Sequence, residues 1–190
     1  MQGRKRMRVV ISGVAGVGKS TVLEYVSKKS QYDIVNYGTL MFEMAKEIGL
    51  VKDRDELRKM NVDTQINLQK KASSAIGKMD NVIVDTHMAI KSPRGYLPGL
   101  PEWVLRELRI SSFFLIEADS SLILDRRRRD TTRKRDTDTL EEIEEHQQVN
   151  RAFAVAYSVY TGATVTFINN PEGMPEEAGK TIAKALTGGE

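Results

Sequence analysis

The sequence contains no cysteine and only two histidines, His87 and His146, among its 190 residues. Disulfide bonds, cysteine-ligated zinc or iron–sulfur sites and a metal site built from several histidines are therefore excluded. A lone histidine is usually a structural hydrogen-bonding residue, and we interpret His87 in that way. His146 stands among four glutamates in residues 141–145, and we interpret it as part of a solvated helix face.

Long apolar runs are also missing, since no window approaches the ~20 consecutive apolar residues that a membrane span needs. Basic residues precede the apolar stretch Val9–Val17, an order that superficially resembles a signal peptide, but Ser12, Gly13 and Gly16 interrupt the stretch. We therefore expect a cytoplasmic protein with no membrane contact. The hydrophobic content of 40% is enough for a core, and the length suits one domain, which we expect to span residues 1–190.

Short apolar runs alternate with longer segments of helical period, which predicts an α/β fold with a mostly parallel five-stranded sheet flanked by helices. The continuous hydrophobicity of the strands predicts burial on both faces. Thr139 with Glu142 indicates a capping box, and Pro175 fits a first helical turn. Three of the five prolines lie in Pro93–Pro101, which we expect to be a stiff surface connection. The expected strands are Met7–Ser12, Ile34–Asn36, Val82–Asp85, Phe113–Glu117 and Thr164–Asn169, and the expected helices are Ser20–Lys29, Thr39–Ile48, Val62–Lys78, Trp103–Leu108, Ser120–Arg129, Leu140–Thr161 and Pro175–Leu186.

Residues 13–20 read Gly-Val-Ala-Gly-Val-Gly-Lys-Ser and match the Walker A pattern G-x-x-x-x-G-K-[ST] without a mismatch. Its glycines let consecutive backbone N–H groups approach phosphate oxygens, and the helix that follows adds its positive dipole end. Lys19 would contact the β- and γ-phosphates of ATP, and the Ser20 hydroxyl would bind Mg²⁺. The motif predicts a P-loop NTPase fold. The expected ATP-binding residues are Gly13, Val14, Ala15, Gly16, Val17, Gly18, Lys19, Ser20 and Thr21.

Asp85 closes the apolar run Val82–Val84, where a Walker B carboxylate would hold Mg²⁺. The alternative is that Asp85 merely caps the next turn. The next residue is Thr86 and not glutamate, so the second carboxylate that activates water in hydrolases is missing, and no Asn-Lys-x-Asp guanine motif occurs. The pattern predicts a P-loop enzyme that passes a phosphoryl group to an acceptor other than water.

Residues 126–135 hold seven of the 29 basic residues and one of the 26 acidic ones. Transfer to a nucleoside monophosphate needs little general base, because the attacking oxygen is already a phosphate oxygen, but it needs converging positive charge. We therefore predict a short mobile lid at residues 126–138, with Arg129, Arg133 and Arg135 as catalytic residues and Arg126 on the adenine or the phosphates. The alternatives are a solvated surface and an RNA-binding patch. No aromatic residue interleaves the run, so the run itself cannot stack on bases, and its position relative to the P-loop fold favours the lid.

The monophosphate acceptor is expected in residues 36–79, after the second strand. Arg54 and Arg58 share one helix face because they are four residues apart, and we favour Arg58 for the acceptor phosphate. Both could instead pair with neighbouring carboxylates. Arg94 is a further candidate, with Lys91 of similar weight. The predicted acceptor-binding residues are Gly38, Thr39, Arg58 and Arg94.

Six blocks resemble the archaeal-type adenylate kinases, a family of P-loop nucleoside monophosphate kinases, from end to end of the chain. The two most specific are Gly-Tyr-Leu-Pro-Gly-Leu-Pro (95–101) and Arg-Asp-Thr-Thr-Arg-Lys-Arg (129–135); the others are residues 13–21, 35–39, 52–59 and 84–87. The resemblance implies that ATP and AMP interconvert with two ADP, with dependence on Mg²⁺, a cytoplasmic location and, in some members, trimers.

Bacterial and eukaryotic adenylate kinases differ from this chain at the acceptor side. They carry Asp-Gly-Phe/Tyr-Pro-Arg where this chain has Asp85-Thr86-His87, so their AMP-phosphate arginines are not carried over. Two other functions stay open at this point: a kinase for another monophosphate or a nucleoside, and a nucleotide-dependent RNA or ribosome-assembly factor.

Overall fold

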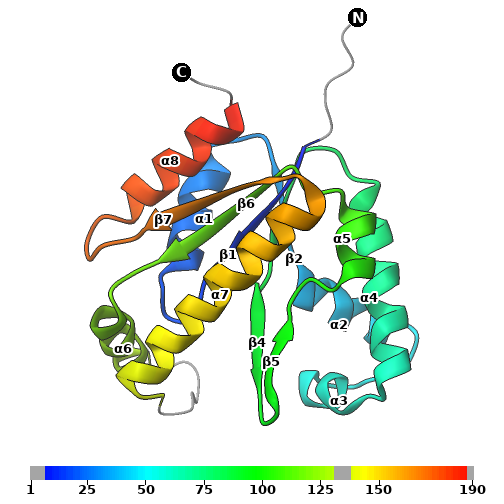
Figure 1. Cartoon of the computed structure of the whole chain (residues 1–190). Coiled ribbons are helices and arrows are strands. Elements are labelled where there is room, and N and C mark those ends of the chain that lie inside the picture. Colours follow the sequence, from blue (N-terminus) through cyan, green and yellow to red (C-terminus); the bar gives the residue numbers. More distant parts are fainter. Residues whose placement is uncertain (1–6, 131–137, 188–190) are drawn as a thin grey trace, which may run out of the picture.

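The computed structural model describes residues 7–130 and 138–187. A five-stranded parallel sheet in the order β2-β3-β1-β6-β7 forms its centre (Figure 1). Its strands are β1 (Arg8–Ser12), β2 (Asp33–Asn36), β3 (Val82–Asp85), β6 (Ser112–Glu117) and β7 (Thr164–Asn169). The parallel sheet with flanking helices confirms the predicted P-loop fold, and all five strands lie where the sequence predicts them, to within one residue.

Helices cover both faces of the sheet. In Figure 1, α7 (Leu140–Thr161) crosses in front of the sheet, and α1 (Lys19–Lys29) and α8 (Pro175–Thr187) lie behind it. The remaining helices are α2 (Tyr37–Glu47), α3 (Arg54–Lys59), α4 (Val62–Gly77), α5 (Glu102–Leu108) and α6 (Ser120–Arg129). The core has two parts because strand side chains alternate between faces. Val9, Ile11 and Ile116 pack with α1 and α8, whereas Val10, Phe113 and Leu115 pack with α2, α4, α5 and α7.

The capping box predicted at residue 139 is present at the start of α7. The Glu142 N–H donates to Thr139 Oγ1 at 3.2 Å, and the Thr139 N–H donates to Glu142 Oε2 at 2.8 Å. The helix α8 begins at Pro175, as predicted. None of the helices in the described part of the chain is long and apolar enough to span a membrane.

The stretch Pro93–Pro101, which we expected to be a stiff surface connection, is partly regular structure. It contains strand β5 (Gly95–Pro98), which pairs with β4 (Ala89–Ser92) in an antiparallel hairpin. Pro93 lies in the turn and Pro98 ends β5, positions at which a missing N–H is tolerated. The hairpin projects from the carboxyl end of the sheet in Figure 1.

The prediction that strands are buried on both faces holds for the central strands β1, β3 and β6 but is wrong for the two edge strands. In β2 the side chain of Ile34 is exposed, and in β7 that of Phe167 is exposed. Each edge strand has a neighbour on one side only, so its apolar residues meet solvent.

Candidate active site

The Walker A residues form the loop between β1 and α1, as the motif predicts. Gly18 is the N-cap of α1 with φ +91°, so Lys19 begins the helix and the free N–H groups of the first turn face the loop. Val14 and Val17 are buried and anchor the loop in the core, while Ala15, Ser20 and Thr21 are exposed. The loop is therefore fixed by its apolar side chains and offers backbone N–H groups and hydroxyls to a ligand.

Lys19, the first residue of α1, and Asp85, the last residue of β3, form an ion pair. The parallel register aligns Asp85 of β3 with Ile11 of β1 on one side and with Asn36 of β2 on the other. Lys19 Nζ also donates to the Thr86 carbonyl at 3.2 Å. The two side chains are only 16% and 14% exposed, so the pair is partly shielded from solvent. The structure thus brings together the phosphate-loop lysine and the predicted metal carboxylate.

Asn36 connects this ion pair to the start of α2, a role that sequence reasoning missed. Its Nδ2 donates to Asp85 Oδ2 at 2.7 Å. Its Oδ1 accepts from the N–H and the hydroxyl of Thr39, both at 2.9 Å, and so caps α2. Arg54 Nη2 then donates to Thr39 Oγ1 at 2.7 Å, and the guanidinium lies 5.5 Å from the centre of the Phe42 ring. One polar chain thus joins the phosphate loop to the predicted acceptor side.

Among the acceptor candidates, Gly38 and Thr39 lie in the first turn of α2, next to the network. Arg54, which we ranked below Arg58 as an acceptor ligand, forms a hydrogen bond with Thr39. The Arg58 side chain lies outside the described part of the structure. Arg94 is exposed at the turn of the hairpin. Lys91 of β4 forms ion pairs with Asp138 at 3.4 Å and with Glu142 at 2.9 Å.

The four consecutive arginines of α6 divide into two pairs. The side chains of Arg126 and Arg127 are 19% and 8% exposed and contact the phosphate loop, whereas those of Arg128 and Arg129 are 71% and 64% exposed. Arg129 Nη2 lies 3.3 Å from Glu172 Oε1. Arg133 and Arg135, the other predicted catalytic arginines, lie outside the described residues.

The two histidines differ in their surroundings. Protein atoms crowd His87, although its side chain still meets solvent, and this desolvation, followed by the Lys19 ammonium, lowers the pKa of His87 to about 4. The imidazole is therefore neutral near pH 7. The interpretation of His146 as a solvated residue is wrong: it is partly buried, its Nε2 lies 3.2 Å from the Ala89 carbonyl, and its ring packs on Tyr96 at 5.2 Å.

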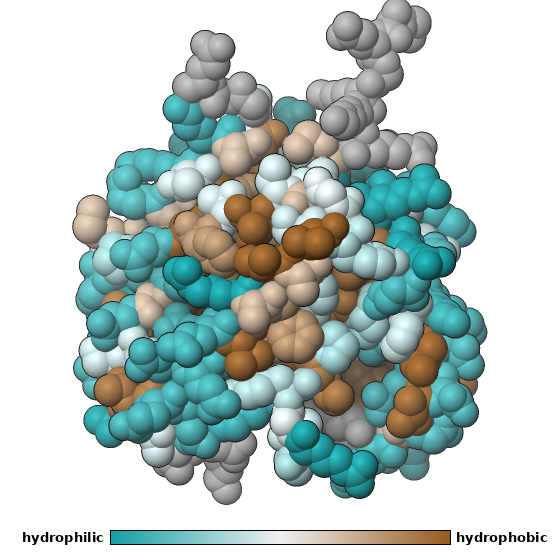
Figure 2. All heavy atoms as spheres, in the orientation of Figure 1, coloured by the Kyte–Doolittle hydropathy of each residue, from teal (hydrophilic) through white to brown (hydrophobic). Residues whose placement is uncertain are grey.

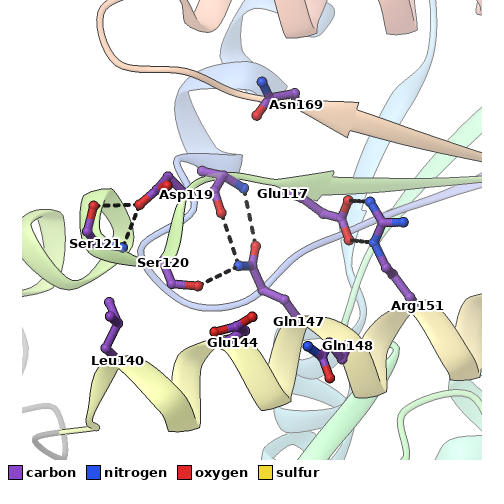
Figure 3. Close-up of a pocket in the computed structure, with 11 residues that line it drawn as sticks. Glu117, Asp119, Ser120, Ser121, Leu140, Glu144, Gln147, Gln148, Arg151 and Asn169 are labelled. Atoms are coloured by element: carbon purple, nitrogen blue, oxygen red, sulfur yellow. Dashed lines mark hydrogen bonds and ion pairs between the residues drawn. The ribbon is translucent and has the colours of Figure 1, made fainter.

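A groove of about 520 Å³ lies apart from Lys19 and Asp85, where α7 packs against the carboxyl end of β6 (Figure 3). The Gln147 side chain pairs with both backbone groups of Ala118, at 3.2 and 3.0 Å, and donates to Ser120 Oγ at 3.2 Å. Arg151 and Glu117 form a two-bond ion pair of 2.6 and 2.5 Å. The polar groups that line this groove thus bind the segment that leads into α6 to α7. They thereby help to position the arginines of α6.

Comparison with known sequences finds a family model over most of the chain and relatives over nearly all of it. Residues 12–144 match a family model described as an AAA domain. An adenylate kinase of Thermoplasma acidophilum is 61% identical over 180 residues, which cover 95% of this chain and 98% of that protein. Adenylate kinases of Thermoplasma volcanium and Methanocaldococcus jannaschii are 57% and 47% identical, each covering at least 95% of this chain and 99% of the other.

Solved structures with the same arrangement of elements include more distant kinases. A shikimate kinase from Acinetobacter baumannii matches with a TM-score of 0.65 at 12% identity, covering 97% of this chain and 95% of that chain. A shikimate kinase from Bacteroides thetaiotaomicron matches with a TM-score of 0.62 at 14% identity, covering 95% and 98%. At this identity the likeness concerns the fold alone.

Proposed function

The chain belongs to the adenylate kinases of archaea, and from this premise we propose how its residues divide the reaction of ATP and AMP among them. The observation that carries the assignment to residues is the polar chain from Lys19 through Asp85 and Asn36 to Thr39, which joins the phosphate loop to α2. Residues 126–138 are proposed as the lid and residues 36–79 as the monophosphate-binding region of one kinase domain spanning residues 1–190.

In the forward direction, an oxygen of the AMP phosphate attacks the γ-phosphorus of ATP. The new bond joins that oxygen to phosphorus, and the bond to the β,γ-bridging oxygen breaks, so that both products are ADP and the reverse step is chemically equivalent. No side chain has to remove a proton from the attacking oxygen. The chain's task is therefore to align the two phosphates and to neutralise their charge. Lys19, Arg129, Arg133 and Arg135 are proposed for that role, with Gly13 to Thr21 and Arg126 holding ATP.

Ser20 and Asp85 are the residues proposed to hold Mg²⁺. Asp85 Oδ1 is paired with the Lys19 ammonium in a partly shielded position, while Ser20 is exposed beside the loop. One hydroxyl and one carboxylate fit Mg²⁺, which prefers oxygen ligands and retains water and substrate phosphates in its shell. When bound, the ion would neutralise charge on the β- and γ-phosphates. Lys19 would then exchange its ion pair with Asp85 for the same phosphate oxygens.

The AMP phosphate is proposed to bind where α2 begins, at Gly38 and Thr39, with Arg58 and Arg94 as further proposed ligands. The hydrogen bond of Arg54 to Thr39 supports adding Arg54 to this group. Arg54 already donates to the Thr39 hydroxyl and stacks on Phe42, and these contacts orient its guanidinium. The guanidinium has five N–H donors, so others are available to bind a phosphate. A guanidinium can bind a phosphate with two parallel hydrogen bonds.

We expect Arg54→Gln to raise the KM for AMP by about 10-fold, because a charged hydrogen bond is worth about 1.5–3 kcal/mol. The KM for ATP should change little, since Arg54 contacts α2 and not the phosphate loop. Steady-state kinetics with each substrate varied would measure both. The matched control is Lys59→Gln, which removes an exposed positive charge from the same helix. An equal rise in both KM values would show that Arg54 does not act at the acceptor.

The activity is tested by incubating the purified protein with ATP, AMP and Mg²⁺ and separating the nucleotides. ADP should appear as both substrates disappear, and EDTA should stop the reaction. CMP, UMP, GMP and adenosine, each offered in place of AMP, would measure how strictly the site selects its acceptor. Loss of ATP without consumption of AMP would instead indicate hydrolysis and would overturn the proposed reaction.

A homo-oligomer and a cytoplasmic location complete the proposal. Figure 2 shows apolar side chains gathered over α7, and exposed apolar residues lie there and on the edge strand β7. They are Val155 (46%), Val159 (81%), Tyr160 (49%) and Phe167 (38%). Such a contiguous apolar face is typical of a surface that contacts another protein chain.

We expect Val159→Glu to lower the mass of the particle in light scattering to 21.4 kDa, the mass of one chain, because a charge at the centre of an apolar contact is costly. The control is Val62→Glu, which introduces the same charge at a residue that is 70% exposed on α4. A wild-type protein that is monomeric at the concentration used for light scattering would overturn the proposal of a homo-oligomer.

A further inference from the structure

Three side chains hold carbonyl oxygens of the phosphate loop. Arg127 Nε donates to the Ala15 carbonyl at 2.8 Å. The Val17 carbonyl accepts two hydrogen bonds, one from Arg126 Nη1 at 3.0 Å and one from Asn170 Nδ2 at 2.8 Å. Asn170 follows β7 and is 153 residues away in sequence from the loop that it contacts. Donors from two separate segments thus converge on alternate carbonyls of the same loop.

A trans peptide points its C=O and its N–H in opposite directions. The described chain has no cis peptide bond, so a donor that fixes the Ala15 carbonyl also fixes the direction of the Gly16 N–H, which points the other way. In the same manner, a donor on the Val17 carbonyl fixes the direction of the Gly18 N–H. Orientation of these N–H groups matters because a phosphate loop binds its ligand through them.

We propose that Arg126, Arg127 and Asn170 form a carbonyl clamp that aims the N–H groups of Gly16 and Gly18 at the phosphates of ATP. Arg127 and Asn170 are positioning residues, because they act through the loop backbone, and Arg126 has this role in addition to the ATP contact proposed above. The proposal rests on the ATP site proposed above. In this proposal Arg126 and Arg127 orient the backbone of the phosphate loop, and other residues contact the phosphoryl group that is transferred.

Burial and charge support the clamp. Asn170 is 1% exposed and the Arg127 side chain 8%, and Arg127 is further held by an ion pair with Asp138. Asn170 Oδ1 is buried without a hydrogen-bond partner in the described structure. The polar contact that the buried Asn170 side chain makes is therefore the hydrogen bond from its Nδ2 to the Val17 carbonyl. Arg128, the next residue on the helix, is 71% exposed and lies 4.0 Å from Asp125.

Two glycines of the motif leave the space that the clamp occupies. A Cβ at Gly16 would lie 2.8 Å from Arg127 Cγ, and a Cβ at Gly18 would lie 2.5 Å from Asn170 Nδ2. Both glycines also have positive φ, +86° and +91°, which disfavours any other residue. Loop and clamp therefore fit together only with glycine at these positions.

The test compares Arg127→Met and Asn170→Ala with the matched control Arg128→Met. In the nucleotide-free protein, the ¹H–¹⁵N resonances of Gly16 should move in Arg127→Met and those of Gly18 in Asn170→Ala, and neither should move in Arg128→Met. Calorimetry should show that each clamp variant binds ATP roughly 10-fold more weakly than the wild-type protein. Steady-state kinetics should show an unchanged KM for AMP. Arg127→Lys should restore ATP binding only partly, because one ammonium lacks the fixed fork that serves the Ala15 carbonyl and Asp138 together.

Unchanged glycine resonances and unchanged ATP affinity in both clamp variants would overturn the proposal. A loss of AMP affinity equal to that of ATP would also overturn it, since it would indicate general loss of structure, and thermal unfolding of each variant would identify a folding defect. If the wild-type protein binds ATP and the clamp variants show the expected glycine shifts, but the wild-type protein makes no ADP from AMP, the clamp stands and the proposed reaction fails.

Discussion

Replacing Lys19 with methionine is expected to lower kcat by about 10²–10³-fold, the effect of removing one preorganised charge-stabilising donor from a transition state. Methionine retains the unbranched stem of lysine and removes the ammonium. The ammonium lies at the first turn of α1, paired with Asp85 and within 3.2 Å of the Thr86 carbonyl, at the carboxyl edge of the sheet. A coupled assay of ADP formation at saturating ATP and AMP would measure the loss.

The control for this variant is Lys28→Met on the same helix. Lys28 is 68% exposed and pairs with Glu24 one turn away, so its removal should leave kcat unchanged. Lys19→Met also leaves the Asp85 carboxylate without its cation, which should lower the melting temperature. The double variant Lys19→Met with Asp85→Asn should recover that stability without recovering activity. Turnover within a few-fold of wild type in Lys19→Met would refute the phosphate role of this lysine.

Replacing Asp85 with asparagine is expected to lower kcat by about 10²-fold and to raise the concentration of Mg²⁺ needed for half-maximal rate. Asparagine has nearly the same shape and can still accept the hydrogen bond from Asn36, so the change removes mainly the negative charge. Kinetics over a titration of free Mg²⁺ would measure both effects.

Asp33→Asn provides the matched comparison for this carboxylate. Asp33 is exposed at the opposite end of β2, remote from the carboxyl edge of the sheet. Its neutralisation should alter neither kcat nor the Mg²⁺ requirement. If Asp85→Asn kept the wild-type Mg²⁺ dependence, the carboxylate would have a structural role alone, and the cap of the following turn would be the better interpretation.

Most of the fold could be predicted because the relevant signals are local. The bounds of α6 and α7 agree with the prediction, since α7 has both residues of its capping box and α6 begins after Asp119, whose side chain accepts from the Ser121 N–H. The β4–β5 hairpin was missed because prolines usually argue against strands. Here they occupy the turn and the last position of β5, where the pairing does not need their N–H groups.

The parts of the site that escaped prediction depend on contacts between distant segments. Asn36 ends a predicted strand and Asn170 follows another, and nothing local in the sequence marks their contacts. Their partners Asp85 and Val17 follow from strand register and from the position of β7. The sequence alone does not distinguish the four consecutive arginines of α6 from one another. The rotation of about 100° per residue in a helix turns the first two toward the phosphate loop and the next two toward solvent.

The double use of Asn36 has a thermodynamic consequence. One side chain caps the helix that begins the acceptor region and also donates to the carboxylate beside the phosphate loop. A ligand that shifts Asp85 therefore changes the free energy of the first turn of α2, and a ligand that shifts that turn changes the free energy of Asp85. Linkage makes such an effect reciprocal, so the factor by which bound ATP alters the affinity for AMP equals the factor by which AMP alters the affinity for ATP.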